Sequence, residues 1–154
     1  MTFRDPKMIE IAAKCKATCI VSHAPLLAKT VKDVHKMKID DIQIVIDELQ
    51  SKKQEMIQAG VAPDKIILDP GIGFGKTMRL NWQLLEFKKY VDGPVMLGHS
   101  RKRFLGTDPK TGEDLPDKDE IRFTPERNLE AAKIVVACET EYLRAHEVAM
   151  YKRL

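Results

Sequence analysis

The alternation of helical and strand-like segments is the feature of this sequence that most constrains its fold. Short apolar runs predict strands, and the amphipathic segments between them predict helices. Strands that alternate with helices pair in parallel through right-handed crossovers. The predicted strands cover residues 18–21, 65–68, 94–97 and 142–145. The sequence therefore predicts an α/β fold built on a parallel sheet.

The ends of the predicted helices are marked by residues typical of helix termini. Asp5-Pro6 and Thr124-Pro125 are typical starts, because Asp or Thr caps the first turn and proline fits within it. Asn81 is a third predicted cap, and Gly60 is the predicted end of a helix over residues 42–58. Two polar stretches, 28–40 and 106–123, are predicted to be loops.

Size, charge and cysteine content limit the possible functions. The 154 residues suffice for a single domain, residues 1–154, but are few for a closed barrel of eight strand–helix units. A net charge of +3 without a dense run of Lys and Arg argues against nucleic-acid binding. No apolar run approaches the roughly 20 residues that span a membrane, and the N-terminus lacks the apolar core of a signal peptide. Three cysteines without zinc-ligand spacing fit free thiols, so we expect a cytoplasmic protein.

The segment 65–76, KIILDPGIGFGK, places a carboxylate directly after a buried strand and before a glycine-rich turn. The carboxyl ends of parallel strands are where α/β proteins build ligand sites, so Asp69 is a candidate binding residue. A structural role in the turn fits the sequence equally well. Nucleotide-binding loops are excluded, because Pro70 and Lys76 stand where such loops need glycine. Phe74, between two glycines, is a candidate stacking platform for a flat ligand.

Basic side chains follow the last two predicted strands. Arg144 and His146 are alternate residues, so they point to the same side of an extended chain and suit a phosphate or diphosphate. Arg101 and Lys102, taken alone, are more typical of solvated surface cations. Two histidines at strand ends fit either a ligand site or a polar rim: His23 and His99. One carboxylate facing several cations predicts a small ligand that donates hydrogen bonds at one end and is anionic at the other.

Three motifs together resemble those of dihydropteroate synthase, the pterin-binding enzyme of folate synthesis. They are DPGIGFGK (residues 69–76), GHSRKRF (98–104) and LRAHEV (143–148). The resemblance implies the C-terminal half of a TIM (β/α)8 barrel, with about four parallel strands and flanking helices. It also implies the family's reaction, in which p-aminobenzoate condenses with 6-hydroxymethyl-7,8-dihydropterin diphosphate to give 7,8-dihydropteroate and diphosphate.

The resemblance also implies roles for individual residues. Asp69 would accept hydrogen bonds from the pterin ring, and Lys102 would contact the pterin carbonyl and face p-aminobenzoate. Phe74 would pack nearby. Arg144 and His146 would hold the leaving diphosphate. With Asp69 and Lys102, these two residues form the expected catalytic set. The remaining residues expected to bind substrate are Ser22, Gly73 and Arg101.

The chain departs from the family pattern in two residues and in one large region. Arg103 stands where Ser is usual, and Ser22 stands where Met is usual. The family's N-terminal half supplies a loop Asn for Mg²⁺ and diphosphate, and an Asp and an Asn for the pterin pocket, without counterparts here. Mg²⁺ is therefore the expected cofactor, with no metal ligand within this chain. Because four parallel strands cannot close a barrel, we expect a homo-oligomer or an N-terminal half-barrel partner.

Three functions are compatible with these features. The leading prediction is a fragment or truncated form of dihydropteroate synthase, with an active site that is incomplete in the isolated chain. The second is a non-catalytic pterin-binding or assembly subunit that needs a partner half. The third is a methyltetrahydrofolate-dependent methyltransferase module, which shares the pterin-binding barrel. The basic motifs favour the synthase, because a methyl donor carries no diphosphate to hold.

Overall fold

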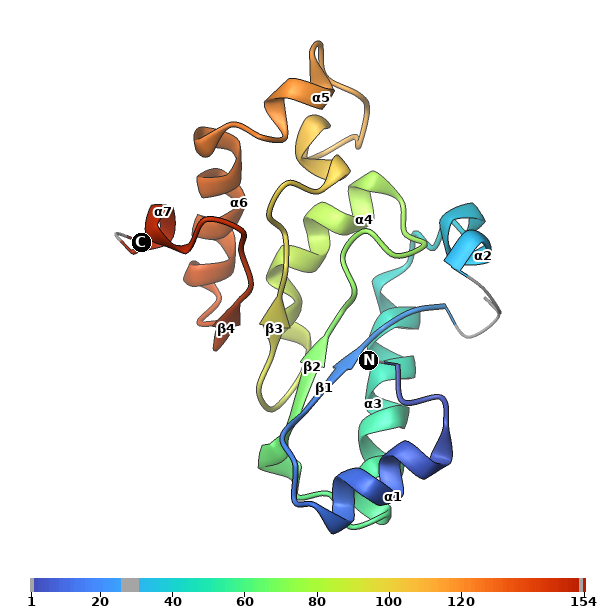
Figure 1. The fold of residues 1–154 in the computed structure, drawn as a ribbon. Helices are drawn as coiled ribbons and strands as arrows, with labels where there is room; N and C mark the ends of the chain where they lie inside the picture. The colour runs from blue at the N-terminus through green and yellow to red at the C-terminus, as the bar shows by residue number, and fades with distance from the viewer. Residues whose placement is uncertain (1, 26–30, 153) are drawn as a thin grey trace.

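A computed structural model describes residues 2–25, 31–152 and 154 of the chain. Short strands alternate with helices along it, as the sequence predicted (Figure 1). The strands are β1 (Cys19–Ser22), β2 (Ile66–Asp69), β3 (Met96–Leu97) and β4 (Tyr142–Leu143). The α-helices are α1 (Pro6–Lys14), α2 (Val31–Lys36), α3 (Ile42–Gln58), α4 (Met78–Gln83), α5 (Lys118–Ile121), α6 (Pro125–Ala137) and α7 (Val148–Tyr151). The 3₁₀ helices are η1 (Pro63–Lys65), η2 (Leu84–Tyr90) and η3 (Arg103–Gly106).

The strands run parallel in the order β1-β2-β3-β4. β1 pairs with β2, which sets Ser22 opposite Asp69, and β3 pairs with β4. A single parallel bridge between Leu68 and Val95 joins the two pairs. Within the described part of the chain, no strand pairs with the outer edge of β1 or of β4. The predicted parallel arrangement is confirmed, and the sheet is open.

The two faces of the sheet have different surroundings. On one face, alternate strand residues such as Val21, Leu68 and Leu97 are buried in a core with residues of α3, α4 and α6. Figure 1 shows α3 and α4 behind the strands. On the other face, Ile20 and Tyr142 remain exposed. A hollow of about 450 Å³ on this open face is lined mainly by apolar residues, among them Phe3, Met8, Ile11, Ile20 and Met96.

Helix ends follow the predicted capping residues with one exception. Asp5 and Thr124 each accept a hydrogen bond from a backbone amide in the first turn of α1 and α6. Gly60 follows the C-cap of α3 with φ +97°, a conformation that glycine adopts without strain. The prediction that Asn81 caps a helix is wrong. Thr77 caps α4, because its hydroxyl accepts the first-turn amide, and Asn81 is buried within that helix.

Each of the two polar stretches predicted as loops contains a short helix. In the first, Val34 of α2 is buried, so one apolar residue anchors the segment to the core. Residues 28–30 of that stretch lie outside the described residues. In the second, an antiparallel bridge between Thr107 and Asp114 closes a small loop ahead of α5. Among the helices of the described residues, none combines the length and apolar character needed to cross a membrane.

Candidate functional site

Asp69, the last residue of β2, lies at the carboxyl end of the sheet and is only 7% exposed. The pairing of β1 with β2 places Ser22 beside it, and Ser22 Oγ donates a 2.9 Å hydrogen bond to Oδ2 of Asp69. Oδ1 of Asp69 accepts the backbone amide of Gly71 at 2.8 Å. Because a carboxylate oxygen accepts two hydrogen bonds, each oxygen keeps one acceptor position for a ligand.

Glycines shape the turn that follows Asp69. Gly71 has φ +66°, and a Cβ at this position would lie 2.0 Å from the carbonyl oxygen of His23. The turn therefore approaches the backbone after β1 more closely than any side chain would allow. Gly73, with φ +86°, is exposed, and its amide donates a 2.7 Å hydrogen bond to Oδ1 of Asn81.

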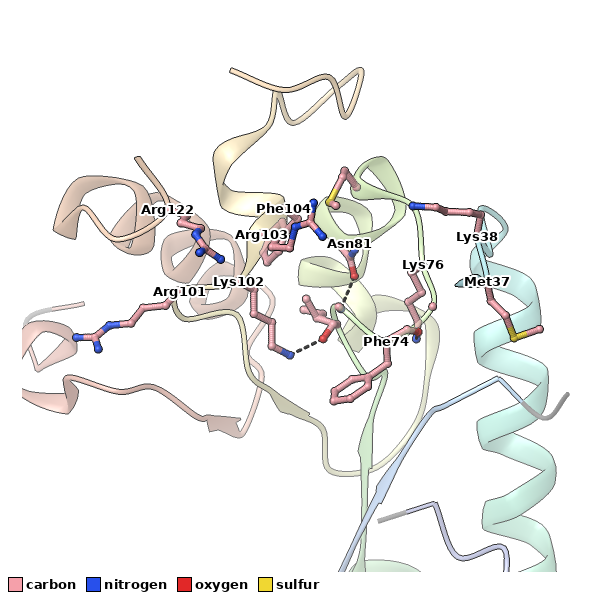
Figure 2. Close-up of a pocket in the computed structure, with 14 residues that line it drawn as sticks. Met37, Lys38, Phe74, Lys76, Asn81, Arg101, Lys102, Arg103, Phe104 and Arg122 are labelled. Carbon is pink, nitrogen blue, oxygen red and sulfur yellow. Dashed lines mark hydrogen bonds between the residues drawn. The ribbon is translucent and has the colours of Figure 1, made fainter. Parts of the chain in front are cut away.

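Phe74 and Lys102 lie next to each other at the centre of the site (Figure 2). Phe74 is 42% exposed, so its ring is open to a ligand. Lys102 Nζ lies 5.4 Å from the centroid of this ring and donates a hydrogen bond to the Ile72 carbonyl. Burial lowers the pKa of Lys102 to about 8; the charge of Asp69 opposes this lowering and that of Arg144 adds to it. An anion near Lys102 would therefore favour its charged form.

A basic hollow of about 340 Å³ lies where β3 and β4 end. Its lining residues are Gly98, Ser100, Lys102, Arg144, Ala145 and His146. Gly98 makes room for Arg144, whose Nε and Nη2 lie 3.2 Å from the position that a Cβ would take. Ser100 Oγ and His146 Nδ1 are 3.0 Å apart. The structure thus brings Lys102, Arg144 and His146 together around a space that suits an anion with several oxygens.

A second hollow, of about 320 Å³, shares Lys102 with the basic hollow and is also lined by Phe74, Arg103 and Arg122. Arg103 is exposed and has no hydrogen-bond or ion-pair partner among the described residues. Arg101 differs, because its guanidinium pairs with Glu147 and points away from Lys102 in Figure 2. The unpaired cation nearest in sequence to Lys102 is therefore Arg103.

His23 and His99 are not rim residues, since they are 3% and 0% exposed. Burial lowers the pKa of His23 to about 3 and that of His99 to about 4. His99 Nε2 donates to the backbone carbonyl of Asn128 at 3.1 Å. Both imidazoles are therefore neutral at pH 7 and act as internal hydrogen-bonding groups.

The side chains of the site do not fit a magnesium ion by themselves. Mg²⁺ prefers carboxylate and other oxygen ligands in octahedral geometry, whereas the basic hollow is lined by Lys102, Arg144 and His146. In the described ranges, no group of three His, Cys, Asp or Glu residues is arranged to hold a metal. The expected Mg²⁺ therefore has no ligand set among these residues.

Two residues that hold the site were not predicted as site residues. Asn81 fixes the amide of Gly73, and Lys76 lies beneath the glycine-rich loop with its ammonium group buried. Each is a polar side chain within an otherwise apolar or glycine-rich stretch. Since burial of a polar group is unfavourable unless it forms hydrogen bonds, this pattern is the signal that marks such residues.

Comparisons with known proteins identify similar chains. The model of a family described as pterin binding enzyme matches residues 1–142. The dihydropteroate synthase of Clostridium beijerinckii is 31% identical over 148 residues, which cover 94% of this chain and 49% of that protein. The dihydropteroate synthase of Mycobacterium leprae is 32% identical over 105 residues, which cover 66% of this chain and 37% of that protein.

Solved structures share the fold. The dihydropteroate synthase of Thermus thermophilus matches with a TM-score of 0.79 at 27% identity, over 99% of this chain and 58% of that chain. The enzyme of Anaplasma phagocytophilum with bound 6-hydroxymethylpterin-monophosphate matches with a TM-score of 0.75 at 27% identity, over 97% and 57% of the two chains. This chain therefore spans about half the length of these relatives, and the predicted half of a TIM barrel is confirmed.

Proposed function

Because this chain belongs to the family of pterin-binding enzymes, we propose that it forms about half of the active site of a dihydropteroate synthase. That reaction joins the amine of p-aminobenzoate to the methylene carbon of 6-hydroxymethyl-7,8-dihydropterin diphosphate. The observation that carries the proposal is a carboxylate next to a group of basic side chains. Asp69 and Arg144 line one hollow, and Arg144 lines a second with Lys102 and His146.

The pterin ring binds between Asp69 and Lys102 in this proposal. A pterin has several N–H donors along one edge, and the free acceptor positions of the Asp69 carboxylate suit them. The ammonium of Lys102 donates to the ring carbonyl. Phe74, exposed and next to Lys102, offers an aromatic surface for the flat ring.

The basic hollow holds the diphosphate. During the reaction the bond between the methylene carbon and the diphosphate oxygen breaks, and its electron pair leaves with diphosphate. A carbon–nitrogen bond forms to the amine, which then loses a proton. Positive groups that are already in place stabilise the charge that develops on the leaving oxygen. Arg144 can form two parallel hydrogen bonds to phosphate oxygens, and His146 and Lys102 add further donors.

The second hollow receives p-aminobenzoate. Phe74 and Lys102 line this hollow, so an aromatic amine bound there would be near the methylene carbon of the proposed pterin. The carboxylate of this substrate needs a cation, and Arg103 is unpaired among the described residues. Arg103 therefore supplies the contact to the carboxylate.

A further half-barrel completes the site, on a separate chain or a continuous one. Three observations support this part of the proposal. The chain spans 58% of the Thermus thermophilus enzyme. The face of the sheet opposite α3, α4 and α6 exposes Tyr142 and Ile20, and Ile20 lines an apolar hollow. Within the described residues, β1 and β4 each have an unpaired outer edge, and such edges favour addition of further strands.

Substitution of Asp69 by Asn is expected to weaken binding of 6-hydroxymethylpterin monophosphate by about 10- to 100-fold. The change keeps the shape of the side chain but removes its charge, and hydrogen bonds to charged groups contribute about 1.5–3 kcal/mol. Titration of pterin fluorescence measures the dissociation constant of each protein. Asp64→Asn is the matched control, because Asp64 lies in η1 at the opposite end of β2. Equal affinity of Asp69→Asn and the unsubstituted chain would contradict the proposed role.

Turnover separates the proposed synthase from a non-catalytic pterin-binding subunit. We expect little or no dihydropteroate from the 154-residue chain alone with both substrates and Mg²⁺, and turnover once the missing half-barrel is supplied. Pterin binding that is never accompanied by product, even in the completed barrel, would favour the subunit. A methyltransferase is disfavoured, because a methyl donor would leave Arg144 and His146 without an anion to bind.

A further inference from the structure

Lys76 is a buried cation that the proposed reaction does not use. It is 5% exposed and lies beneath the glycine-rich loop between β2 and α4. Its Nζ donates to the carbonyl oxygens of Gly71 and Phe74, each at 3.0 Å, and lies 2.9 Å from Nδ1 of His23. The three acceptors match the three hydrogens of a protonated amine.

His23 connects this ammonium group to α3. Its Nδ1 can accept from Lys76 only in the neutral form with the proton on Nε2, and the lowered pKa of His23, about 3, is consistent with that form. Nε2 then faces Glu48, with 3.0 Å to Oε2, although the two groups lack the alignment of a hydrogen bond. The contact is therefore mainly electrostatic. The carboxylate of Glu48 therefore lies behind the neutral imidazole that accepts from the charged form of Lys76.

The loop above Lys76 needs such fixed points because its backbone is flexible by composition. Gly71, Gly73 and Gly75 all have positive φ, and glycine loses more conformational freedom on ordering than other residues. Lys102 holds the Ile72 carbonyl, and Figure 2 shows Lys76 and Lys102 on opposite sides of the loop. Lys76 thus connects two carbonyls of the loop to the side chain of His23, which follows β1.

We propose that Lys76 is a positioning residue, whose buried amine, in contact with His23, holds the glycine-rich loop in the shape that presents Phe74 to the ligand. Lys76 touches no substrate in this role. Its contribution to pterin binding rests on the proposed function, whereas its effect on the loop does not. In the neutral form two N–H groups still donate to the Gly71 and Phe74 carbonyls, and the lone pair can accept from a protonated Nδ1 of His23. The contacts that hold the loop therefore survive loss of the proton.

The charged groups around Lys76 place this change near neutral pH. Burial lowers the pKa of Lys76 to about 7. The charge of Asp69 on β2 opposes this lowering, that of Lys102 adds to it, and that of Glu48 on α3 opposes it. His23 remains neutral over this range, and Arg4 is a further cation that acts on His23. An opened loop would return the amine to water and to its ordinary pKa of 10.5, so the closed loop gains stability as the pH rises above about 7. Removal of the Glu48 charge should shift the start of this gain to lower pH.

Hydrogen exchange of the loop peptide over pH 6 to 9 tests the proposal without any ligand. After correction for the intrinsic rate, we expect protection of residues 70–76 to rise about tenfold or more between pH 7 and pH 9 as Lys76 deprotonates. In Lys76→Met, which keeps the stem but removes the donors, protection should be independent of pH and lower than that of the unsubstituted chain at pH 9. Lys52→Met is the matched control, because Lys52 forms its ion pair with Glu55 on the surface of α3. Wild-type protection and pH dependence in Lys76→Met would overturn the proposal.

Glu48→Gln keeps the test decisive if Lys76→Met does not fold. The side chain of Glu48 is 24% exposed, and glutamine keeps its shape while it removes the charge. The pH at which loop protection starts to rise should decrease in this variant, and an unchanged starting pH would also overturn the proposal. A pterin titration over the same pH range is a separate measurement. If the loop loosens in Lys76→Met but pterin does not bind the unsubstituted chain at any pH, the positioning role stands and the proposed function fails.

Discussion

Acidification from pH 7 to pH 4 is expected to destabilise this chain strongly, because His23 and His99 are buried in their neutral forms. The pKa of each is lowered from 6.5, to about 3 for His23 and about 4 for His99. Burial is the main cause in both cases. The charge of Lys76 adds to the lowering for His23, and that of Lys102 adds to it for His99.

The direction of the effect follows from proton binding in the two states. The unfolded chain binds protons at both histidines near pH 6.5, whereas the folded chain does so only near pH 3 to 4. Between these limits the unfolded state holds more protons, so the free energy of unfolding decreases as the pH falls. The loss is about 1.4 kcal/mol per pH unit for each histidine, or on the order of 6 kcal/mol at pH 4. The raised pKa of Glu48, caused by burial, gives a smaller opposing contribution.

Urea unfolding at a series of pH values measures this loss, which is comparable with the whole stability of a small domain, roughly 5–15 kcal/mol. His99→Gln keeps a donor for the Asn128 carbonyl but cannot titrate. We expect the slope of the unfolding free energy against pH to decrease by about one proton in this variant. His146→Gln is the control, because His146 is exposed. The same slope in His99→Gln and the unsubstituted chain would show that another group drives the transition.

Substitution of Gly71 by Ala is expected to destabilise the chain by about 2–5 kcal/mol, the sum of a left-handed backbone penalty and overpacking. The added Cβ would lie 2.0 Å from the His23 carbonyl oxygen, and this is a backbone atom that cannot turn aside. Relief of the clash must separate the turn from β1. The hydrogen bond between the Gly71 amide and Asp69 would then lengthen, so ligand binding should weaken as well.

Gly60→Ala is the matched control for this substitution. Gly60 also has a positive φ, +97°, but the nearest atom to an added Cβ is that of Ala13 at 3.9 Å. Only the backbone penalty applies there, about 1–2 kcal/mol. Urea unfolding of both variants separates the free-energy cost of the backbone conformation from that of the steric clash. If Gly71→Ala lost no more stability than Gly60→Ala, the turn would have to lie farther from the His23 carbonyl oxygen.

The order of elements could be predicted from the sequence because strands and helices leave local patterns. The apolar runs became β1 to β4, and Asp5, Thr124 and Gly60 mark helix ends as predicted. Local patterns are less reliable where two candidate capping residues lie close together in the sequence. Thr77 and Asn81 are both good capping residues four positions apart, and tertiary contacts decide between them: Asn81 is needed inside the fold to hold Gly73.

The parts of the site that could not be predicted depend on distant segments. The burial of Lys76 requires an acceptor from His23, 53 residues earlier in the chain, and no local pattern carries that information. The pairing of Arg101 with Glu147 similarly joins residues 46 apart. From the sequence alone, Lys102 is typical of a solvated surface cation. In the fold it meets Phe74 and the ends of two strands.

The position of Lys102 in the walls of both site hollows has a consequence for the order of events. A polyanion in the basic hollow would raise the pKa of Lys102 and keep it positively charged. Near pH 8, where the amine of the empty protein is partly neutral, an acid arriving in the neighbouring hollow would then meet a fuller positive charge. At that pH Lys102 would favour binding of the two ligands together, against the repulsion between their charges and without movement of the backbone.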